Sequence, residues 1–318
     1  MMKKILLVKT SSLGDVVHNL PVASDIRAAA PGAAIDWVVE EPFAAIPRLH
    51  PGVTRVITVA IRRWRSQLLN SAVREEVRAF ARELKREPYD AVIDTQGLLK
   101  SAVVAWAARG TRHGLDFASA REPLSLFYDR TYSVPWTMHA VERNRALAAQ
   151  ALAYAVPLTV NYGISASPEK FVWLPDGPYA VLLHAASARA KLWPGERWIE
   201  LATRLLERGM RSVLPWGNAG ERLRAEEIAR AVPGAVVAPG LPLADVPAVL
   251  AGARAAVGVD TGIAHLAAAL KVPTIGIYCA TDPSATGLYG CARAINLGSP
   301  GVPPSVSEVL AALEKAIK

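Results

Sequence analysis

Residues 5–15 read ILLVKTSSLGD, an apolar run followed by a short polar turn and the start of a helical pattern. The apolar run at 5–8 predicts a strand buried on both faces, as in a parallel sheet covered by helices. The turn after it is where a ligand is expected, because open α/β sheets bind ligands beyond the carboxyl ends of their strands. It lacks the GxGxxG glycines, which disfavours a dinucleotide-binding fold.

The same alternation of apolar runs and helical patterns continues along the chain. The first series predicts further strands at residues 35–39, 53–59 and 91–93, and a helix at 71–86. A second series predicts strands at 179–183, 212–214, 235–238, 255–259 and 274–278, with helices at 196–208, 221–231 and 305–317. Connection rules make each series a right-handed doubly wound unit. The predicted fold class is therefore α/β, with two Rossmann-like domains facing each other across a cleft.

Prolines separate the two series. Pro157, Pro168, Pro175 and Pro178 interrupt any long helix between them. A chain of 318 residues also exceeds what one hydrophobic core usually supports. We predict an N-terminal domain over residues 1–160, a linker over 161–178 and a C-terminal domain over 179–318 that ends in a helix.

The positive charge is concentrated in the first half of the chain. The formal net charge is +8, and residues 1–160 contain 21 Lys and Arg against 15 Asp and Glu, whereas residues 161–318 contain 15 against 13. The N-terminal half is therefore expected to meet an anionic partner. Anionic lipid, sugar acid and nucleic acid all fit that sign, and charge alone does not choose among them.

Several familiar signals are missing from the sequence. No apolar stretch is long enough for a secretory signal or a membrane-spanning helix, which predicts a cytoplasmic protein. Cys279 and Cys291 lack the spacing of a zinc site and are expected to be free thiols. There is no D-x-D triad, P-loop, G-x-S-x-G or H-E-x-x-H, so the residues predict neither a metal nor a cofactor.

Asp15 is the candidate catalytic residue of the first turn. It follows the first predicted strand and lies just inside the next helix, where chemistry is expected in this fold. A carboxylate at this position also stabilises the N-terminal end of a helix without any catalytic role. Both interpretations of Asp15 remain open from the sequence.

A second strand–turn–helix element has the sequence GVDTGIAH at residues 258–265. Asp260, Thr261 and Gly262 open the predicted helix, and free backbone N–H groups at such an end bind phosphate. The alternative is an ordinary Asp N-cap followed by a core His265, although this does not account for two such turns in one chain.

The turn after the first strand of the second series supplies further candidates. Ser187 offers a hydroxyl and Lys191 a positive charge close to the expected position of a diphosphate, although a surface loop with incidental charges explains them equally well. Glu221 follows the next strand, where an acidic residue commonly hydrogen-bonds a ribose hydroxyl.

The first half of the chain contains a cluster of arginines. Arg62, Arg63 and Arg65 can bind phosphate or carboxylate in bidentate geometry, although a solvated run of charges is the usual explanation. Arg121 follows in a later loop of the same half. Together they predict a basic acceptor side.

Motifs distributed over nearly the whole chain resemble one protein family. They are V-K-T-S-S-L-G-D at 8–15, W-V-V-E-E at 37–41, A-I-R-R-W-R at 60–65, Y-D-A-V-I-D-T-Q-G-L at 89–98, A-R-E-P-L at 120–124, H-A-V-E-R at 139–143, L-P-W-G at 214–217 and V-D-T-G at 259–262. Their order and spacing resemble glycosyltransferase family 9, and the I-R-R-W-R element resembles its lipopolysaccharide heptosyltransferase I group.

The resemblance implies a GT-B fold and an inverting, metal-independent transfer without a cofactor. Heptose would move from ADP-heptose, held by the C-terminal domain, to the Kdo of Kdo2-lipid A, held by the N-terminal domain, in lipopolysaccharide inner-core synthesis. Asp15 would be the general base. The donor contacts would be Ser187, Lys191, Glu221, Asp260, Thr261, Gly262 and His265, and the acceptor contacts Arg62, Arg63, Arg65 and Arg121.

The same resemblance implies a peripheral protein at the cytoplasmic face of the inner membrane, with transient contact with the anionic membrane surface and no nucleic-acid partner. One departure from the family is Ala186-Ser187, where Thr-Thr is common, so one hydroxyl contact is missing. Two other functions remain open. A sugar-nucleotide epimerase would leave the arginines idle, and a non-catalytic nucleotide-binding module would leave Asp15 as a helix-end carboxylate.

Overall fold

The computed structural model describes residues 4–67 and 69–318. The chain divides into two compact units, Met1–Ile164 and Ser165–Lys318. Residues 153–178 contain no helix or strand, in keeping with the prolines of this stretch. Each unit has its own parallel sheet covered by helices, which confirms the predicted α/β class with two Rossmann-like domains.

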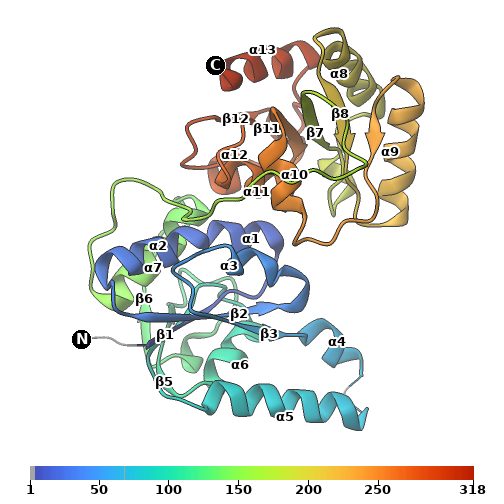
Figure 1. Ribbon diagram of the computed structural model, residues 1–318. Coiled ribbons are helices and arrows are strands. Elements are labelled where there is room, and N and C mark those ends of the chain that lie inside the picture. Colours follow the sequence, from blue (N-terminus) through green and yellow to red (C-terminus); the bar gives the residue numbers. More distant parts are fainter. Residues whose placement is uncertain (1–3, 68) are drawn as a thin grey trace. The chain divides into compact units, whose positions relative to one another are not determined.

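The first unit is built on six parallel strands (Figure 1). They are β1 (Lys4–Val8), β2 (Ala34–Glu40), β3 (Arg55–Val59), β4 (Tyr89–Asp94), β5 (Gly110–Leu115) and β6 (Arg130–Tyr132). Their order in the sheet is β3-β2-β1-β4-β5-β6. Strands β1 to β3 are therefore added toward one edge of the sheet and β4 to β6 toward the other, which makes the gap between β1 and β4 a topological switch point. A switch point is the expected ligand position of an open α/β sheet.

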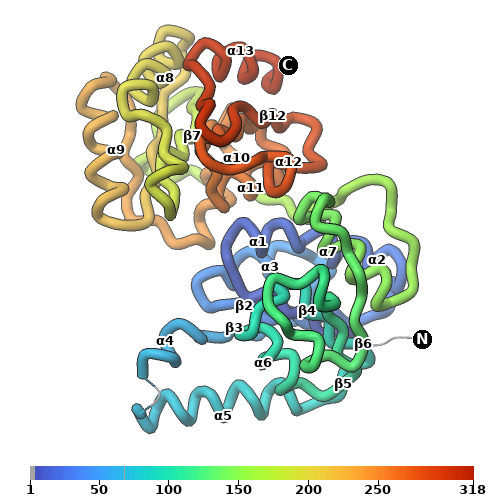
Figure 2. The backbone as a smooth tube through the Cα atoms, turned by 180° about the vertical axis from the view of Figure 1, so that it is seen from behind, coloured from blue at the N-terminus to red at the C-terminus, as the bar shows by residue number. Residues whose placement is uncertain are grey.

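Helices cover both faces of this sheet, as Figures 1 and 2 both show. One layer contains α1 (Leu13–His18), α2 (Leu20–Ala29), α3 (Ala45–Arg48) and α7 (Ala140–Leu152), and the other contains α5 (Ser71–Lys85) and α6 (Leu99–Ala107). Short helices α4 (Ile61–Ser66), η1 (Glu41–Phe43) and η2 (Ser125–Phe127) lie in the connections. Leu6 and Val8, which point to one face of β1, pack with Leu84 of α5 and Val104 of α6.

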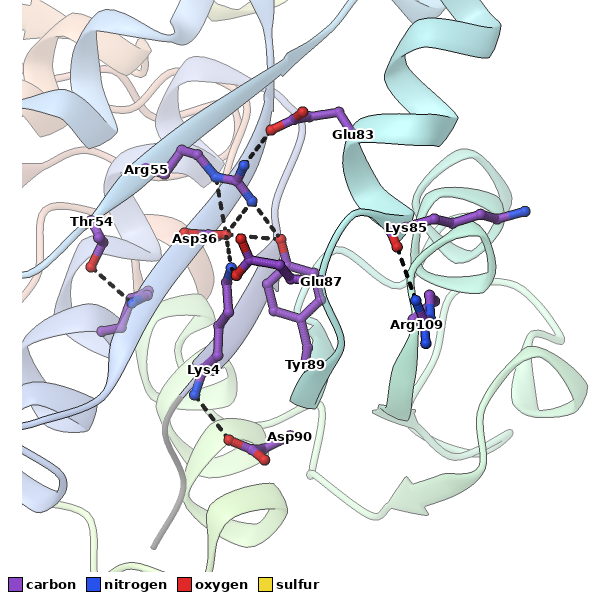
Figure 3. Close-up of polar contacts among 11 residues, drawn as sticks. Lys4, Asp36, Thr54, Arg55, Glu83, Lys85, Glu87, Tyr89, Asp90 and Arg109 are labelled. Atoms are coloured by element: carbon purple, nitrogen blue, oxygen red, sulfur yellow. Dashed lines mark hydrogen bonds and ion pairs between the residues drawn. The ribbon is translucent and has the colours of Figure 1, made fainter.

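An ionic network around the buried Asp36 joins the amino-terminal parts of three strands (Figure 3). Oδ2 of Asp36 in β2 accepts hydrogen bonds from Nη2 of Arg55 in β3 (2.6 Å) and from the hydroxyl of Tyr89 in β4 (2.8 Å). Asp36 is only 2% exposed. Burial, helped by the adjacent carboxylate, raises the pKa of the Tyr89 phenol. This network fixes the amino ends of the strands, at the sheet edge away from the switch-point turns.

The second unit repeats the architecture of the first. Its strands are β7 (Tyr179–Leu183), β8 (Arg211–Leu214), β9 (Val236–Val237), β10 (Ala255–Val259), β11 (Thr274–Ile277) and β12 (Ala294–Leu297), all parallel. The sheet order is β12-β11-β10-β7-β8-β9. Counted along the chain within each unit, both sheets therefore have the strand order 3-2-1-4-5-6, and the second switch point lies between β7 and β10.

The main core of the second unit lies beneath three helices, α8 (Gly195–Glu207), α9 (Ala219–Ala231) and α13 (Val306–Ile317). Trp193 and Trp198 pack edge to face in this core, with their ring centroids 5.1 Å apart. Helix α11 (Gly262–Ala269) packs on β10 and β11, and α10 (Val246–Gly252) packs against it. Short helices η3 (Arg189–Lys191) and α12 (Pro283–Thr286) complete the unit.

Two further features of the described chain concern its cysteines and its apolar helices. Cys279 and Cys291 are free and partly buried, and burial raises the pKa of the Cys291 thiol to about 12. Within residues 4–67 and 69–318, none of the helices has both the length and the apolar character that crossing a bilayer requires.

Candidate functional site

Asp15 lies in the turn that leads from β1 into α1. Ser12 is the N-cap of α1, and the Asp15 carboxylate accepts hydrogen bonds from the Ser12 amide (2.8 Å) and the Ser12 hydroxyl (2.9 Å). Ser12 donates both bonds, so the Asp15 carboxylate takes the place that the third helical residue has in a capping box. Asp15 thus performs the helix-end role that the sequence left open as an alternative.

Asp15 also lines a cavity of about 170 Å³ at the switch point between β1 and β4. The cavity is bordered by the turns after these two strands and by the segments around α7. The lining side chains include Lys9, Ser11, Ser12, Thr95, Gln96, Arg121, Trp136, Arg143 and Asn144. A carboxylate therefore shares a polar cavity with three cationic side chains.

Lys9, the first residue of the predicted turn at 9–15, is a buried cation of this cavity for which no role was predicted. Its Nζ donates to the carbonyl oxygen of Thr95 (2.8 Å) and to Oδ1 of Asn144 (3.3 Å). Burial lowers the pKa of the Lys9 amine; two neighbouring carboxylates partly oppose this shift, and Arg121 and Arg143 add to it. Lys9 thus ties the turn after β4 to α7 behind the cavity.

Arg143 is a second residue whose role was not predicted. Its guanidinium carbon lies 3.7 Å from the centroid of the Trp136 ring, and Nη2 donates to the carbonyl oxygen of Ser119 (2.6 Å). Its Nε is buried and has no hydrogen-bond partner among the residues that the structure describes. Arg143 thus has an unused donor in a cavity that also includes the predicted acceptor residue Arg121.

Lys100 connects the start of α6 to the turn after β1. Its Nζ donates to the hydroxyl of Ser11. Burial lowers the pKa of Lys100, and Glu40 and Asp15 partly oppose that shift. Glu40 ends β2, where burial raises the pKa of its carboxyl, and Oε1 is buried without a hydrogen-bond partner in the described part of the chain. The carboxyl edge of the sheet therefore carries charges of both signs beside Asp15.

The arginines of the I-R-R-W-R element lie on α4 and are not among the residues that line the cavity. Arg62, Arg63 and Arg65 are all exposed. Arg63 is paired with Glu76 (2.8 Å) and Glu41 (3.3 Å), as expected for a solvated run of charges. Of the four predicted acceptor arginines, Arg121 alone is among the residues that line the cavity.

The second unit brings most of the predicted donor residues together at its own switch point. Lys191, in η3 after β7, places its Nζ 2.6 Å from Oδ2 of Asp260, which follows β10. The same oxygen accepts a hydrogen bond from the hydroxyl of Thr281 (2.8 Å), and Nε2 of His265 lies 3.6 Å from Oδ1. Thr281 was not predicted, although the Thr-Asp-Pro sequence at 281–283 was a visible signal.

Asp260 is held ionised by these neighbours. Burial alone would raise the pKa of its carboxyl, but contacts with His265, Lys191 and Thr281 outweigh that effect and hold the pKa well below its usual range. Thr261 then caps α11 without a side-chain hydrogen bond, so the first amides of that helix have no intrahelical acceptor. A positive helix end next to an oriented lysine suits a phosphate group.

Ser187 and Glu221 are less closely joined to this cluster. Ser187 is exposed in the loop before η3. Glu221 lies in the first turn of α9, where its carboxylate accepts a hydrogen bond from the amide of Gly217 (2.7 Å) after β8. Both residues nevertheless follow carboxyl ends of strands in the same sheet. In the described part of the chain, no three His, Cys, Asp or Glu side chains are grouped so as to hold a metal ion.

Comparison with known proteins adds the family context. The family model described as glycosyltransferase family 9 (heptosyltransferase) matches residues 77–309. Lipopolysaccharide heptosyltransferase 1 of Pseudomonas aeruginosa is 52% identical over 93% of this chain and 84% of its own length. The protein of the same name from Escherichia coli K12 is 48% identical over 90% of this chain and 91% of its own length.

The solved structures that resemble this chain include a heptosyltransferase. The E. coli heptosyltransferase WaaC with ADP has a TM-score of 0.91 at 43% identity, covering 98% of this chain and 99% of its own. The same protein with ADP-2-deoxy-2-fluoro heptose has a TM-score of 0.86 at 44% identity, with the same coverage. The two sheets of this chain therefore belong to a GT-B fold.

Proposed function

Because the chain belongs to glycosyltransferase family 9, the heptosyltransferases, it is a heptose-transferring enzyme of lipopolysaccharide core synthesis, and we propose that its acceptor is the Kdo of Kdo2-lipid A. The observation that carries this proposal is the cavity in which Asp15 lies with Lys9, Arg121 and Arg143. A Kdo sugar has a carboxylate for the cations and a hydroxyl for the base.

The donor in this proposal is ADP-L-glycero-D-manno-heptose, bound at the switch point of the second unit. Support comes from the ADP and fluoro-heptose nucleotide held by the E. coli relative. In this chain the amides of Thr261 and Gly262, with Lys191, would meet the diphosphate. Asp260 and His265 would hold Lys191 and the turn in place, and Ser187 and Glu221 would meet the phosphate and ribose.

The proposed reaction is a single inverting displacement. Asp15 takes the proton of the Kdo hydroxyl while that oxygen forms a bond to the anomeric carbon of heptose. The bond from the same carbon to the ADP oxygen breaks, and its electron pair leaves with ADP. Lys191 and the α11 amides stabilise the growing negative charge, so we expect transfer to proceed without a divalent metal.

The exposed arginines of α4 would bind a different part of the acceptor. Arg62, Arg65 and the partly neutralised Arg63 would contact phosphates of the lipid A part of the acceptor, outside the cavity that receives Kdo. We place the enzyme at the cytoplasmic face of the inner membrane, in transient contact with anionic lipid and without a nucleic-acid partner. The net charge of the first half of the chain supports this arrangement.

The decisive test separates the proposed base from the helix cap. Glu308 provides a matched control, because it accepts from the amide (2.7 Å) and hydroxyl (2.6 Å) of Ser305 at the start of α13, as Asp15 does from Ser12. Transfer from ADP-heptose to Kdo2-lipid A is measured in EDTA for wild type, Asp15→Asn and Glu308→Gln, together with the affinity for ADP.

We expect Asp15→Asn to lose transfer by at least about a thousandfold with ADP affinity unchanged, because the carboxylate acts in the transition state. Glu308→Gln should transfer at the wild-type rate. Transfer by Asp15→Asn at a rate near that of Glu308→Gln would reduce Asp15 to a helix cap, as in a nucleotide-binding module. Release of an altered ADP-sugar without acceptor would instead indicate an epimerase.

A further inference from the structure

One helix of the first unit exposes an apolar stripe. Leu99, Val103 and Trp106 of α6 are 51%, 49% and 63% exposed. They are spaced at i, i+4 and i+7, so they lie on one face of the helix. Of the eleven large apolar side chains that are exposed in the described chain, eight belong to the first unit, and only α6 aligns three of them.

The stripe is not part of the core of the unit. The other faces of α6 are already packed, since Val104 and Ala105 are buried in the core with β1 and α5, and Ala102 packs with Leu124 and Tyr128. A row of three exposed apolar side chains is typical of a surface that binds a partner or a membrane.

Three cationic residues lie near the far end of the stripe, after α6 and at the end of α5. Arg109 follows α6 and donates from Nη1 to the backbone oxygen of Lys85 at the end of α5 (3.4 Å; Figure 3). In the described chain, neither of these residues nor Arg86 forms an ion pair, whereas the nearby Glu83 and Glu87 are paired with Arg55 and Lys4. The face formed by Leu99, Val103, Trp106, Lys85, Arg86 and Arg109 is hereafter the α6 face.

The near end of the stripe adjoins the cavity of the first unit. Leu98 lines the cavity, and α6 begins at the next residue, Leu99. From Leu99 to Trp106 the helix rises about 10 Å. A surface that lies along α6 therefore reaches the rim of the cavity that contains Asp15.

We propose that the α6 face rests on the surface of an anionic lipid bilayer, with the apolar stripe at the level of the headgroups and the basic end against lipid phosphates. An amphipathic tryptophan beside unpaired cations is typical of such an interface. The proposal rests on the proposed function in one respect: a bilayer held here would bring a lipid-borne acceptor to the cavity. A second copy of the chain is less suitable, because three side chains are far from the roughly 1,200 Å² that a stable protein interface buries.

The test uses vesicles that contain no acceptor, so it does not depend on the enzyme activity. Binding of the full chain to phosphatidylglycerol–phosphatidylcholine vesicles and to pure phosphatidylcholine vesicles is measured by sedimentation. The variants are Val103→Ser combined with Trp106→Ser, and Arg109→Gln. Leu223→Ser is the matched control, because Leu223 is an exposed (62%) apolar residue on α9 of the second unit.

We expect wild type and Leu223→Ser to bind the anionic vesicles, and the double variant to bind at least about tenfold more weakly. Arg109→Gln should weaken binding severalfold at low salt and less at high salt. All variants should keep wild-type turnover on a deacylated, water-soluble Kdo acceptor, which separates this proposal from the proposed function.

Equal vesicle binding by wild type and the double variant would overturn the proposal, as would binding of wild type only to vesicles that carry the acceptor. A change of the double variant from dimer to monomer in light scattering would also overturn it, because the α6 face would then be an interface between copies.

Discussion

At the scale of single residues, Asp260 places a carboxylate where the leaving diphosphate is proposed to bind. Its partners explain this position, because Lys191 contacts it at 2.6 Å and Thr281 at 2.8 Å. The carboxylate thus fixes a flexible lysine in one place, which lowers the entropy that the lysine would lose on binding a phosphate.

Asp260→Asn tests this view, because simple repulsion and positioning predict opposite results. If the carboxylate only repelled the ligand, its removal would tighten ADP binding. We expect a weakening of about tenfold, measured by calorimetric titration with ADP, because Lys191 and His265 lose their anchor. Asp245→Asn is the control, since Asp245 caps α10 without a side-chain hydrogen bond, and it should bind ADP as wild type does. Tighter binding by Asp260→Asn would contradict the positioning role.

His50 is expected to make the stability of the first unit depend on pH. Its Nδ1 accepts a hydrogen bond from the amide of Gly52 (2.9 Å), so Nε2 carries the hydrogen and donates to the hydroxyl of Ser24 (2.8 Å). Burial lowers the pKa of His50 to about 4. The unfolded chain therefore binds a proton first as the pH falls from about 6.5 to about 4, and stability falls over that range.

We expect this effect to cost about 2 kcal/mol at pH 5 relative to pH 7.5. Proton NMR titration of His50 should show an inflection near pH 4, and His50→Gln should reduce the loss of urea resistance between the two pH values. Some loss should remain, because burial also lowers the pKa of His184 to about 4. An inflection of His50 near pH 6.5 would contradict the prediction.

At the scale of secondary-structure elements, the ionic network of Figure 3 fixes the amino ends of β2, β3 and β4. Asp36→Asn leaves Arg55 without its buried partner, and we expect a loss of about 2–3 kcal/mol of stability, measured by urea unfolding. Glu75→Gln is the control, because its pair with Arg82 is exposed on both sides and should contribute less than about 1 kcal/mol. Equal losses in the two variants would show that the network does not act as a clamp.

Hydrophobic periodicity predicts some of the strands and misses others. The strands expected at 179–183 and 255–259 match β7 and β10 to the residue, because each is a continuous apolar run. The strands β5, β6 and β12 were not predicted. Their sequences, GTRHGL, RTY and AINL, are short, polar or rich in glycine, and they become strands because the neighbouring strand offers hydrogen-bonding groups.

At the scale of the whole molecule, the sequence predicts the turns of the candidate site but not the buried side chains behind them. The two turns at residues 9–15 and 258–262 were predicted from the strand–turn–helix pattern, because the ends of parallel strands gather ligands. Arg143 and Lys9 were not predicted as site residues. Their roles depend on stacking with Trp136 and on burial behind Thr95, which bring together segments far apart in the chain.

The matching strand orders of the two sheets have a consequence for how such an enzyme diversifies. Each unit closes its own sheet and core, and residues 165–178, at the start of the second unit, contain no helix or strand. A genetic crossover in this stretch cuts no ladder of backbone hydrogen bonds. In the proposed division of roles, where the first unit binds the acceptor and the second binds the nucleotide, lineages can exchange first halves and so change the acceptor while the donor chemistry is kept.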